Sequence, residues 1–200
     1  IDFDKNNKKI ITQPGITIDT LNNYLKPMNL LVTPDPSTTN RATVGGVIGN
    51  NSCGAHSVIY GKTIDHVNSL ETILSNGNNH KFEKLSFNSF ESLLNKGSLE
   101  SNIYSNSLNL FKEYTDELEK KFPKIQRRVG GYNLDEINKG GYVDLTKLIV
   151  GSEGTLATIT EAELNLVDLP NNKGLLVIEF SDIIKSMEAS IHALEFGPSA

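Results

Sequence analysis

The chain has 200 residues, of which 38% are hydrophobic and 22% charged, a balance typical of a folded globular protein. Its formal net charge of -5 argues against general nucleic-acid binding, which needs a basic surface, and implies that any phosphate ligand is held mainly by backbone N–H groups. Because Cys53 is the single cysteine, the chain can form no internal disulfide and no zinc or iron–sulfur site built from thiolates, and a reducing compartment is favoured.

The start of the chain predicts a strand, a capped helix and a second extended segment. We predict a strand over residues 9–13, ending at the turn pair Pro14-Gly15. Thr17 is placed to cap the helix that follows, whose apolar residues share one face, and Pro27 should end that helix. A new extended segment begins at residues 30–32.

The middle of the chain combines a long irregular stretch with clearer elements. Residues 41–61 are rich in Gly, Asn and Ser and have no sustained period, so we expect a functional loop there. Residues 67–74 predict a strand that turns at residues 75–77 into a hairpin. A helix is predicted from about Ser101 to Pro123, with an apolar stripe from Leu108 to Phe122 that we interpret as core packing.

The last third predicts two further strands and a final helix. The remaining elements are a strand over 162–167, a linker at 170–172, a strand over 175–180 and an amphipathic helix over 182–196. Strands and helices do not alternate strictly along the chain, so the predicted fold class is α+β. We expect one domain over residues 1–169 and the start of another over residues 170–200.

The segment Ala42–Gly54 carries the strongest chemical signal. Its four glycines let the backbone approach a ligand closely, and successive N–H groups in such a loop form a concave site suited to a diphosphate. The spacing fits neither a Walker loop, because no Gly-Lys-Ser/Thr follows, nor the Rossmann fingerprint. From composition alone, an ordinary glycine-rich turn explains the segment equally well.

A resemblance to known flavoenzymes decides between these interpretations. With Pro34-Asp35-Pro36-Ser37 before it and Tyr60-Gly61-Lys62-Thr63 after it, the glycine segment resembles the FAD-binding segment of FAD-linked oxidases of the vanillyl-alcohol-oxidase (PCMH) type. Gly151–Ala162 resembles that family's second flavin-contacting loop and strand. The most similar group comprises D-lactate dehydrogenases, the flavin subunit of glycolate oxidase and D-2-hydroxyglutarate dehydrogenases.

Further residues are similar to one branch of this group, in which the flavin part is fused to a C-terminal iron–sulfur portion. They are Asn50–Ser57, Phe122-Pro123 and Tyr132–Asp135, together with the helical insertion between the two flavin motifs. The resemblance implies a PCMH-type FAD-binding domain over residues 1–169 and the start of a ferredoxin-like substrate (cap) domain over residues 170–200. It implies FAD as the cofactor, no metal site in this segment, and an iron–sulfur cluster only elsewhere in the parent protein.

The resemblance also implies the residues that line the cofactor. Ala157 stands where relatives often carry glycine, which places a methyl group near the cofactor without excluding it. The expected cofactor-binding residues are Pro34, Asp35, Ser37, Thr38, Ala42, Thr43, Gly45, Gly46, Asn50, Asn51, Cys53, Gly54, Glu153, Gly154 and Ile159.

A few side chains have competing interpretations. Cys53 is interpreted as a packed small residue rather than as a flavin attachment point or a redox thiol. His56 is a candidate for flavin contact or proton transfer, with a loop histidine bonded to its own backbone as the plainer interpretation. Arg127, Arg128 and Tyr132 are candidates for substrate binding, since an Arg can fork onto a carboxylate, and solvated surface charge is the alternative.

By resemblance, the parent protein oxidises a D-2-hydroxyacid of the D-lactate, glycolate or D-2-hydroxyglutarate class by hydride transfer to flavin N5, and passes electrons to an iron–sulfur centre or a quinone. We expect a cytoplasmic protein, at most peripheral to the inner membrane, with no transmembrane segment, because its apolar runs fall far short of ~20 residues. The alternatives are another flavin oxidoreductase on the same scaffold, acting on carbohydrates or aryl alcohols, and a non-catalytic nucleotide-binding module.

The chain opens on Ile1 rather than on Met, and we expect it to start inside a longer protein. The family's first flavin segment is expected before Ile1, and most of the cap, with the catalytic base, after residue 200. We therefore expect weak or no FAD binding and little or no catalysis from these 200 residues alone.

Overall fold

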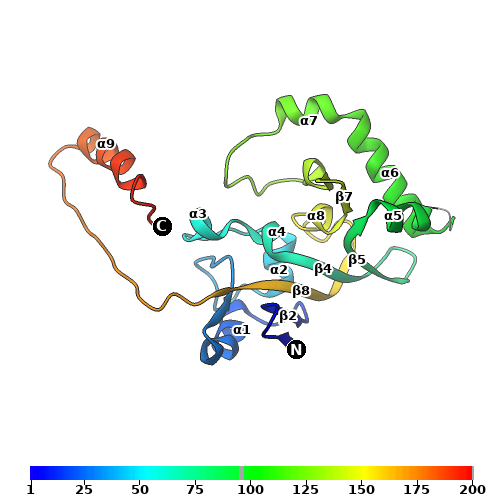
Figure 1. Cartoon of the computed structure of the whole chain (residues 1–200), viewed down its shortest axis with the longest axis horizontal. Helices are drawn as coiled ribbons and strands as arrows, with labels where there is room; N and C mark the ends of the chain where they lie inside the picture. The colour runs from blue at the N-terminus through cyan, green and yellow to red at the C-terminus, as the bar shows by residue number, and fades with distance from the viewer. Residues whose placement is uncertain (95–96, 200) are drawn as a thin grey trace.

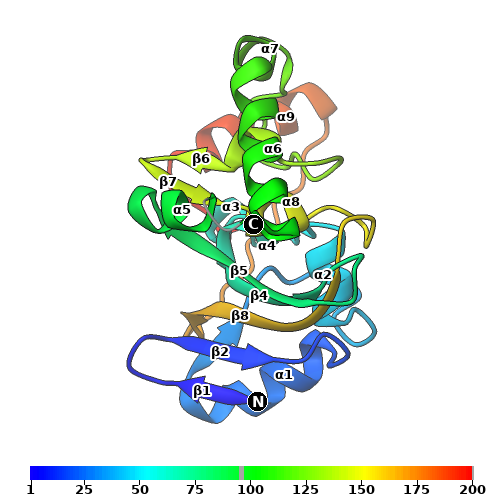
Figure 2. The same ribbon diagram turned by 90° about the vertical axis from the view of Figure 1, so that its right-hand side faces the viewer.

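An antiparallel sheet forms the centre of the molecule, as a computed structural model that describes residues 1–94 and 97–199 shows (Figures 1 and 2). The strand order is β1-β2-β8-β4-β5-β7-β6, and β3 pairs with β8 beside this path. The strands are β1 Asp2–Asp4, β2 Lys9–Thr12, β3 Leu30–Val32, β4 Val67–Ile73, β5 Asn79–Ser86, β6 Asn138–Lys139, β7 Tyr142–Asp144 and β8 Thr158–Asp168. Helices and antiparallel strands are mixed, which confirms the α+β class.

The helices are short except in the insertion between β5 and β6. They are α1 Ile18–Leu25, α2 Val44–Gly49, α3 Ser57–Tyr60, α4 Thr63–His66, α5 Phe87–Leu94, α6 Leu99–Glu113, α7 Thr115–Lys121, α8 Thr146–Ile149 and α9 Ile183–Leu194, with 3-10 turns η1 Lys26–Met28 and η2 Leu134–Glu136. Figure 1 shows the helices of the insertion gathered on the side of the sheet where β5 and β7 lie.

The longest strand, β8, organises the sheet because β2, β3 and β4 all pair with it. Its alternate residues Ala162, Leu164 and Leu166 are buried, at 1%, 4% and 5% exposure, and they face Ile10 and Leu70 of the neighbouring strands in the core cluster. This period of two is the pattern that predicted a strand over 162–167, and the strand extends beyond both ends of that range.

The first helix forms where its sequence signals predicted. The Thr17 hydroxyl accepts the amide of Thr20 at 3.3 Å and caps α1, while Ile18, Leu21 and Leu25 are buried. The helix ends at Leu25 and tightens into η1, which contains Pro27. The strand over 67–74 and its hairpin turn are confirmed by the pairing of β4 with β5.

The predicted long helix is instead two helices, α6 and α7, which meet at Tyr114. Thr115 Oγ1 donates to the carbonyl of Phe111 at 2.7 Å, a local bond of the kind that bends helices. Leu108 and Leu118 are buried as expected, but Tyr114 is 44% exposed, so the apolar stripe is core packing only in part.

Two other predictions need correction, and some elements were not predicted. The stretch 41–61 is not irregular throughout: it holds α2 and α3, because Val44, Val47 and Ile48 have helical spacing and are buried. The helix α5 and the short strands β6 and β7 were not predicted. The strand over 175–180 is absent from the described part of the chain, since no neighbouring strand pairs with it and Leu175 is 90% exposed.

The predicted final helix is present as α9, capped by the side chain of Asp182, which accepts the amide of Lys185 at 3.1 Å. Beyond β8 the chain leaves the sheet, and α9 stands apart from it (Figure 1). Several large apolar residues of this last segment are exposed, among them Phe196 at 89%.

His80 gives the stability of the fold a predictable pH dependence. Its ring centroid lies 4.5 Å from that of Phe82 and 6.0 Å from that of Tyr104, and burial lowers its pKa from the ordinary 6.5, against a smaller opposing effect of Glu100. The unfolded chain therefore binds more protons than the folded chain as the pH falls below the unfolded pKa, and the free energy of unfolding decreases there.

We expect His80→Gln to weaken this loss of stability, measured by urea unfolding at about pH 7.5 and about pH 5.5. The matched control is His192→Gln, because the side chain of His192 is 78% exposed on α9. An unchanged pH dependence in the His80 variant would contradict the assignment.

Candidate cofactor site

The glycine segment is organised around the short helix α2. The Thr43 hydroxyl caps this helix by accepting the amide of Gly46 at 3.2 Å, and Val44 and Ile48 anchor it in the core. Gly45 lies directly against the turn after β2, where an added Cβ would sit 2.7 Å from Pro14 Cβ. The glycines of this segment therefore serve close backbone packing as well as ligand approach.

The Pro34–Ser37 segment and the end of the glycine segment touch each other. The Nδ1 of His56 bonds to Oδ2 of Asp35, and a side chain at Gly54 would overlap the carbonyl oxygen of Asp35. His56 thus bonds to a carboxylate across the site, which corrects the plainer interpretation that it bonds to its own backbone. Neither side chain is fully buried, at 36% exposure for His56 and 29% for Asp35.

The second motif, residues 151–155, docks on the C-terminal end of α2. The amide of Gly151 donates to the carbonyl of Ile48, and that of Glu153 to the carbonyl of Gly49, both at 3.0 Å. Gly151 has φ of +88° and Glu153 φ of +54°, so the motif turns sharply where it meets the helix. The two segments that resemble flavin-contacting loops are therefore parts of one site.

A third segment, residues 126–133, contacts both motifs, and we call it the bridging segment. Arg127 Nη2 donates to the carbonyl of Gly54 at 2.9 Å, and Gln126 Nε2 to those of Ser57 and Val58, each at 3.0 Å. At its other end, the Tyr132 hydroxyl lies 2.8 Å from Thr155 Oγ1. Two of the predicted substrate residues, Arg127 and Tyr132, therefore adjoin the two motifs.

Arg128 lies differently from its neighbour. Its Nη2 donates to both carboxylate oxygens of Asp135 at 2.8 Å, its guanidinium stacks 4.7 Å from the ring of Phe122, and its side chain is 11% exposed. Separating such a largely buried pair would leave an uncompensated charge, so the pairing fixes the position of Arg128. The structure thus gives Arg128 the role of holding the bridging segment to η2.

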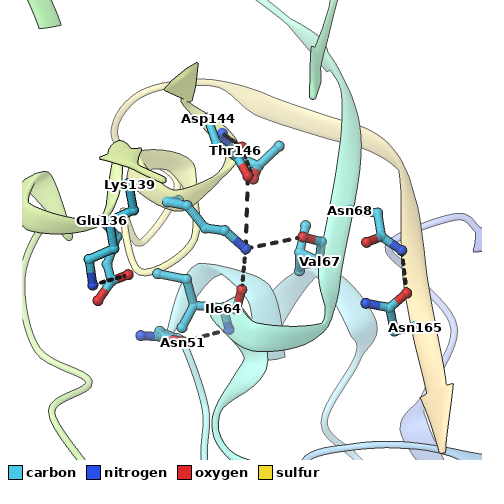
Figure 3. Close-up of polar contacts among 10 residues, drawn as sticks. Asn51, Ile64, Val67, Asn68, Glu136, Lys139, Asp144, Thr146 and Asn165 are labelled. Carbon is cyan, nitrogen blue, oxygen red and sulfur yellow. Dashed lines mark hydrogen bonds and ion pairs between the residues drawn. The ribbon is translucent and has the colours of Figure 1, made fainter. Parts of the chain in front are cut away.

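The turn from α4 into β4 is fixed from both sides of the site. Asn51 Oδ1 accepts the amide of Ile64 at 3.0 Å, and Lys147 Nζ donates to the carbonyls of Ile64 at 2.6 Å and Val67 at 3.4 Å. Figure 3 shows Asn51, Ile64 and Val67 at this turn, opposite Asp144 and Thr146. Lys147 thereby supplies a donor to carbonyls at the end of α4. Because Lys147 lies on α8, which leads into the second motif, these bonds also connect that motif to the chain that follows the glycine segment.

A polar hollow of about 290 Å³ opens beside Lys147. Its charged groups are already engaged: Lys139 Nζ lies 2.7 Å from Glu136, and Lys84 Nζ lies 4.0 Å from the ring centre of Tyr142. Asn68 donates across the neighbouring strands to Asn165 at 2.6 Å (Figure 3). The hollow is therefore a structural feature of the fold rather than a second candidate site.

Polar groups without a hydrogen-bond partner lie around the two motifs, and their chemistry shows whether the site suits a flavin nucleotide. Oδ1 of Asp35 and Nδ2 of the fully buried Asn51 have no hydrogen-bond partner in the described part of the chain. In the same described residues, the amides of Cys53, Ala55 and His56 find no acceptor. Free amides suit a diphosphate, and a lone carboxylate oxygen suits a hydroxyl donor, so these residues fit FAD.

The other predicted cofactor residues occupy varied positions. Residues 36–42 form a turn in which the amide of Ala42 donates to the carbonyl of Thr38 at 2.8 Å, and this turn is bonded to the start of α1. Cys53 is half-buried, and Gly154 is exposed at the tip of the second motif. Ile159 lies on β8, where its side chain packs against the core.

Sequence reasoning missed Gln126 and Lys147. Each bonds to backbone carbonyls far away in the chain, and nothing in the local sequence marks a side chain for such a role. Asn133 lies within the segment Tyr132–Asp135 that resembles one branch of the family, but its bond to the carbonyl of Val150, at 2.8 Å, could not be predicted from the local sequence either.

Within residues 1–94 and 97–199, no cluster of three or more His, Cys, Asp or Glu side chains is placed to hold a metal ion. Over the same residues, no helix is long and apolar enough to cross a bilayer.

Comparison with known proteins identifies the class of this site. Residues 1–83 match the FAD binding domain family, and this domain indicates FAD as the cofactor. The matched residues include α2 and the unpaired groups described above. The first part of the chain is therefore similar to FAD binding domains.

The individual proteins that the chain is similar to belong to a narrower class than the family as a whole. The chain is 36% identical over 170 residues to the D-2-hydroxyglutarate dehydrogenase of Pantoea ananatis, covering 84% of this chain and 17% of that protein. It is 30% identical over 184 residues to the glycolate oxidase subunit GlcD of Bacillus subtilis, covering 92% of this chain and 28% of that protein. The chain thus spans less than a third of the length of these relatives.

A solved structure, alkyldihydroxyacetonephosphate synthase, superposes with a TM-score of 0.52 at 20% identity, covering 86% of this chain and 22% of that one. At this level of identity the likeness concerns the fold alone.

Gly54 provides a direct test of the close approach at the site. We expect Gly54→Ala to destabilise the chain by about 1–3 kcal/mol, because the added Cβ would overlap the Asp35 carbonyl oxygen and lie 2.6 Å from Oδ1. Urea unfolding measures the difference. The matched control is Gly15→Ala, where no atom lies within 4 Å of the new Cβ, and equal effects of the two substitutions would refute this packing.

Lys147 provides a second test. Lys147→Met keeps most of the side-chain volume but leaves two carbonyls without their donor, so we expect a loss of about 1–2 kcal/mol in unfolding free energy. The same substitution at the exposed Lys173 should change little. A Lys147 variant as stable as the Lys173 variant would show that these bonds contribute nothing.

Proposed function

We propose that the protein to which this chain belongs is an FAD-dependent dehydrogenase that oxidises a D-2-hydroxyacid, with D-2-hydroxyglutarate as the first substrate to test. The observation that carries the proposal is the meeting of the two glycine motifs at the end of α2, in a chain that is 36% identical to a D-2-hydroxyglutarate dehydrogenase. Glycolate and D-lactate are the next candidates, because a glycolate oxidase subunit and D-lactate dehydrogenases are also similar.

The chain's own residues would hold the cofactor through backbone groups and a few side chains. The free amides of Cys53, Ala55 and His56 and the exposed loop at Glu153 and Gly154 are suited to the diphosphate. Oδ1 of Asp35 is suited to accept a hydroxyl of the flavin's sugar chain, and Nδ2 of Asn51 to donate to an oxygen. When bound, FAD supplies the redox chemistry, while the protein orients it and excludes side reactions.

Substrate recognition would fall to the bridging segment. Arg127 is exposed, and only its Nη2 donates to the Gly54 and Ala55 carbonyls. Its other N–H donors are therefore available for bidentate binding of a carboxylate. Tyr132 is 46% exposed beside Thr155. Arg128, paired with Asp135, is the weakest of the three candidates.

We also propose that residues 170–200 begin a separate substrate domain. Within residues 175–196, large apolar side chains such as Leu176, Ile183 and Met187 are more than half exposed, which favours packing against a further part of the protein. Electrons would pass to an iron–sulfur centre or a quinone, and the single cysteine favours a cytoplasmic location, at the inner membrane if a quinone is the acceptor.

Anaerobic titration of the whole protein tests the proposal. We expect flavin absorption bands that bleach on addition of D-2-hydroxyglutarate and not of its L-isomer. Bleaching by D-lactate or glycolate instead would keep the reaction class and change the substrate. Flavin bands that none of these acids bleaches would favour another flavin oxidoreductase on this scaffold. A protein that contains no flavin would refute the proposal that it is a flavin-dependent enzyme.

A further inference from the structure

The loop that follows Cys53 is gripped by two neighbouring side chains of the bridging segment. Gln126 Nε2 donates to the carbonyls of Ser57 and Val58, each at 3.0 Å. Arg127 Nη2 donates to the carbonyls of Gly54 at 2.9 Å and Ala55 at 3.4 Å. Four carbonyls within residues 54–58, which we call the gripped loop, are thus bonded to two residues far away in the chain.

This grip fixes the direction in which the loop presents its polar groups. The carbonyls of Gly54, Ala55, Ser57 and Val58 are bonded to the bridging segment, whereas the amides of Cys53, Ala55 and His56 have no acceptor among the described residues. An anion binds to amide groups and is repelled by carbonyl oxygens. A loop free to rotate its peptide groups would have to be ordered when the anion binds, at a cost in affinity.

The bridging segment is itself anchored independently of the gripped loop. The Asn133 side chain donates to the carbonyl of Val150 at 2.8 Å, and Arg128 is paired with Asp135. On its other side the segment follows α7, the last helix of the insertion, after residues 122–125, and Figure 1 shows the chain returning from α7 toward the body of the molecule. The grip therefore links the helical insertion to the glycine segment.

We propose that Gln126 and Arg127 are positioning residues that hold the gripped loop in the conformation that binds FAD, so that cofactor affinity depends on the segment after the helical insertion. This inference rests on the proposed function, because it concerns the same cofactor site. It adds two side chains that bond to the loop's backbone from the side opposite the free amides.

The test compares matched variants of the whole protein. Gln126→Glu is isosteric but replaces a donor by an acceptor that repels the two carbonyls, and Arg127→Met removes both of its bonds. The control is Lys124→Met, since Lys124 is exposed just before the bridging segment. We expect the dissociation constant for FAD, measured by flavin fluorescence without substrate, to rise about tenfold in either variant and to stay unchanged in the control.

Three further measurements separate positioning from general stability. Because both side chains are exposed, the unfolding temperature of the apoprotein should stay within about 2 °C of the wild type. Arg127→Lys should recover part of the affinity, since an ammonium can still reach a carbonyl. In the apoprotein, cleavage by chymotrypsin after Tyr60, just beyond the gripped loop, should be faster in Gln126→Glu and Arg127→Met than in the control.

Unchanged FAD affinity in the variants, or a fall in affinity matched by an equal loss of apoprotein stability, would overturn the positioning role. If the wild-type protein binds no FAD, the proposed function fails with it. The cleavage rate then still decides whether Gln126 and Arg127 hold the loop, and equal rates in variants and control would exclude it.

Discussion

The carbonyls at the C-terminal end of α2 need donors, because the last carbonyls of a helix have no partner within it. The amides of Gly151 and Glu153 supply them, at 3.0 Å each. This contact brings the second motif onto the first, and it places Tyr132 and Asn133 where they can bond to residues 150–155. Together with the bridging segment and Lys147, this contact joins the two motifs into one candidate cofactor site.

The site is built mainly from backbone groups, which agrees with the acidic composition of the chain. The chain has a net charge of -5, and the free amides around Cys53 can hold a diphosphate without a positive side chain. The charged side chains near the site are used on protein groups instead. Lys147 bonds to carbonyls at a helix end, and Arg128 to a carboxylate.

Local signals predicted the elements that local interactions decide. Thr17 caps α1 and the alternation of β8 marks its buried face, and both features can be read within a few residues. The resemblance of residues 34–63 predicted the match of residues 1–83 to the FAD binding domain family. Two features were not predicted from the sequence. The helix α6 ends at Tyr114 beside the local bond from Thr115 to Phe111, and within the described residues no strand lies beside residues 175–180. The bonds of Gln126 and Arg127 to the gripped loop could not be predicted, because every residue has a backbone carbonyl and the sequence does not indicate which of them a distant side chain contacts.

The position of β8 in the sheet has a consequence for synthesis of the chain. Within the described residues it is the last strand to be synthesised, yet it lies between β2 and β4, which both pair with it. Until residues 158–168 emerge, these two strands have open edges, and open edges invite pairing with other chains. Pairing between strands so far apart in the chain is also slow, because the chain loses conformational entropy before the strand contacts stabilise it. The nascent chain therefore passes through an interval in which protection of its strand edges must come from outside the sheet.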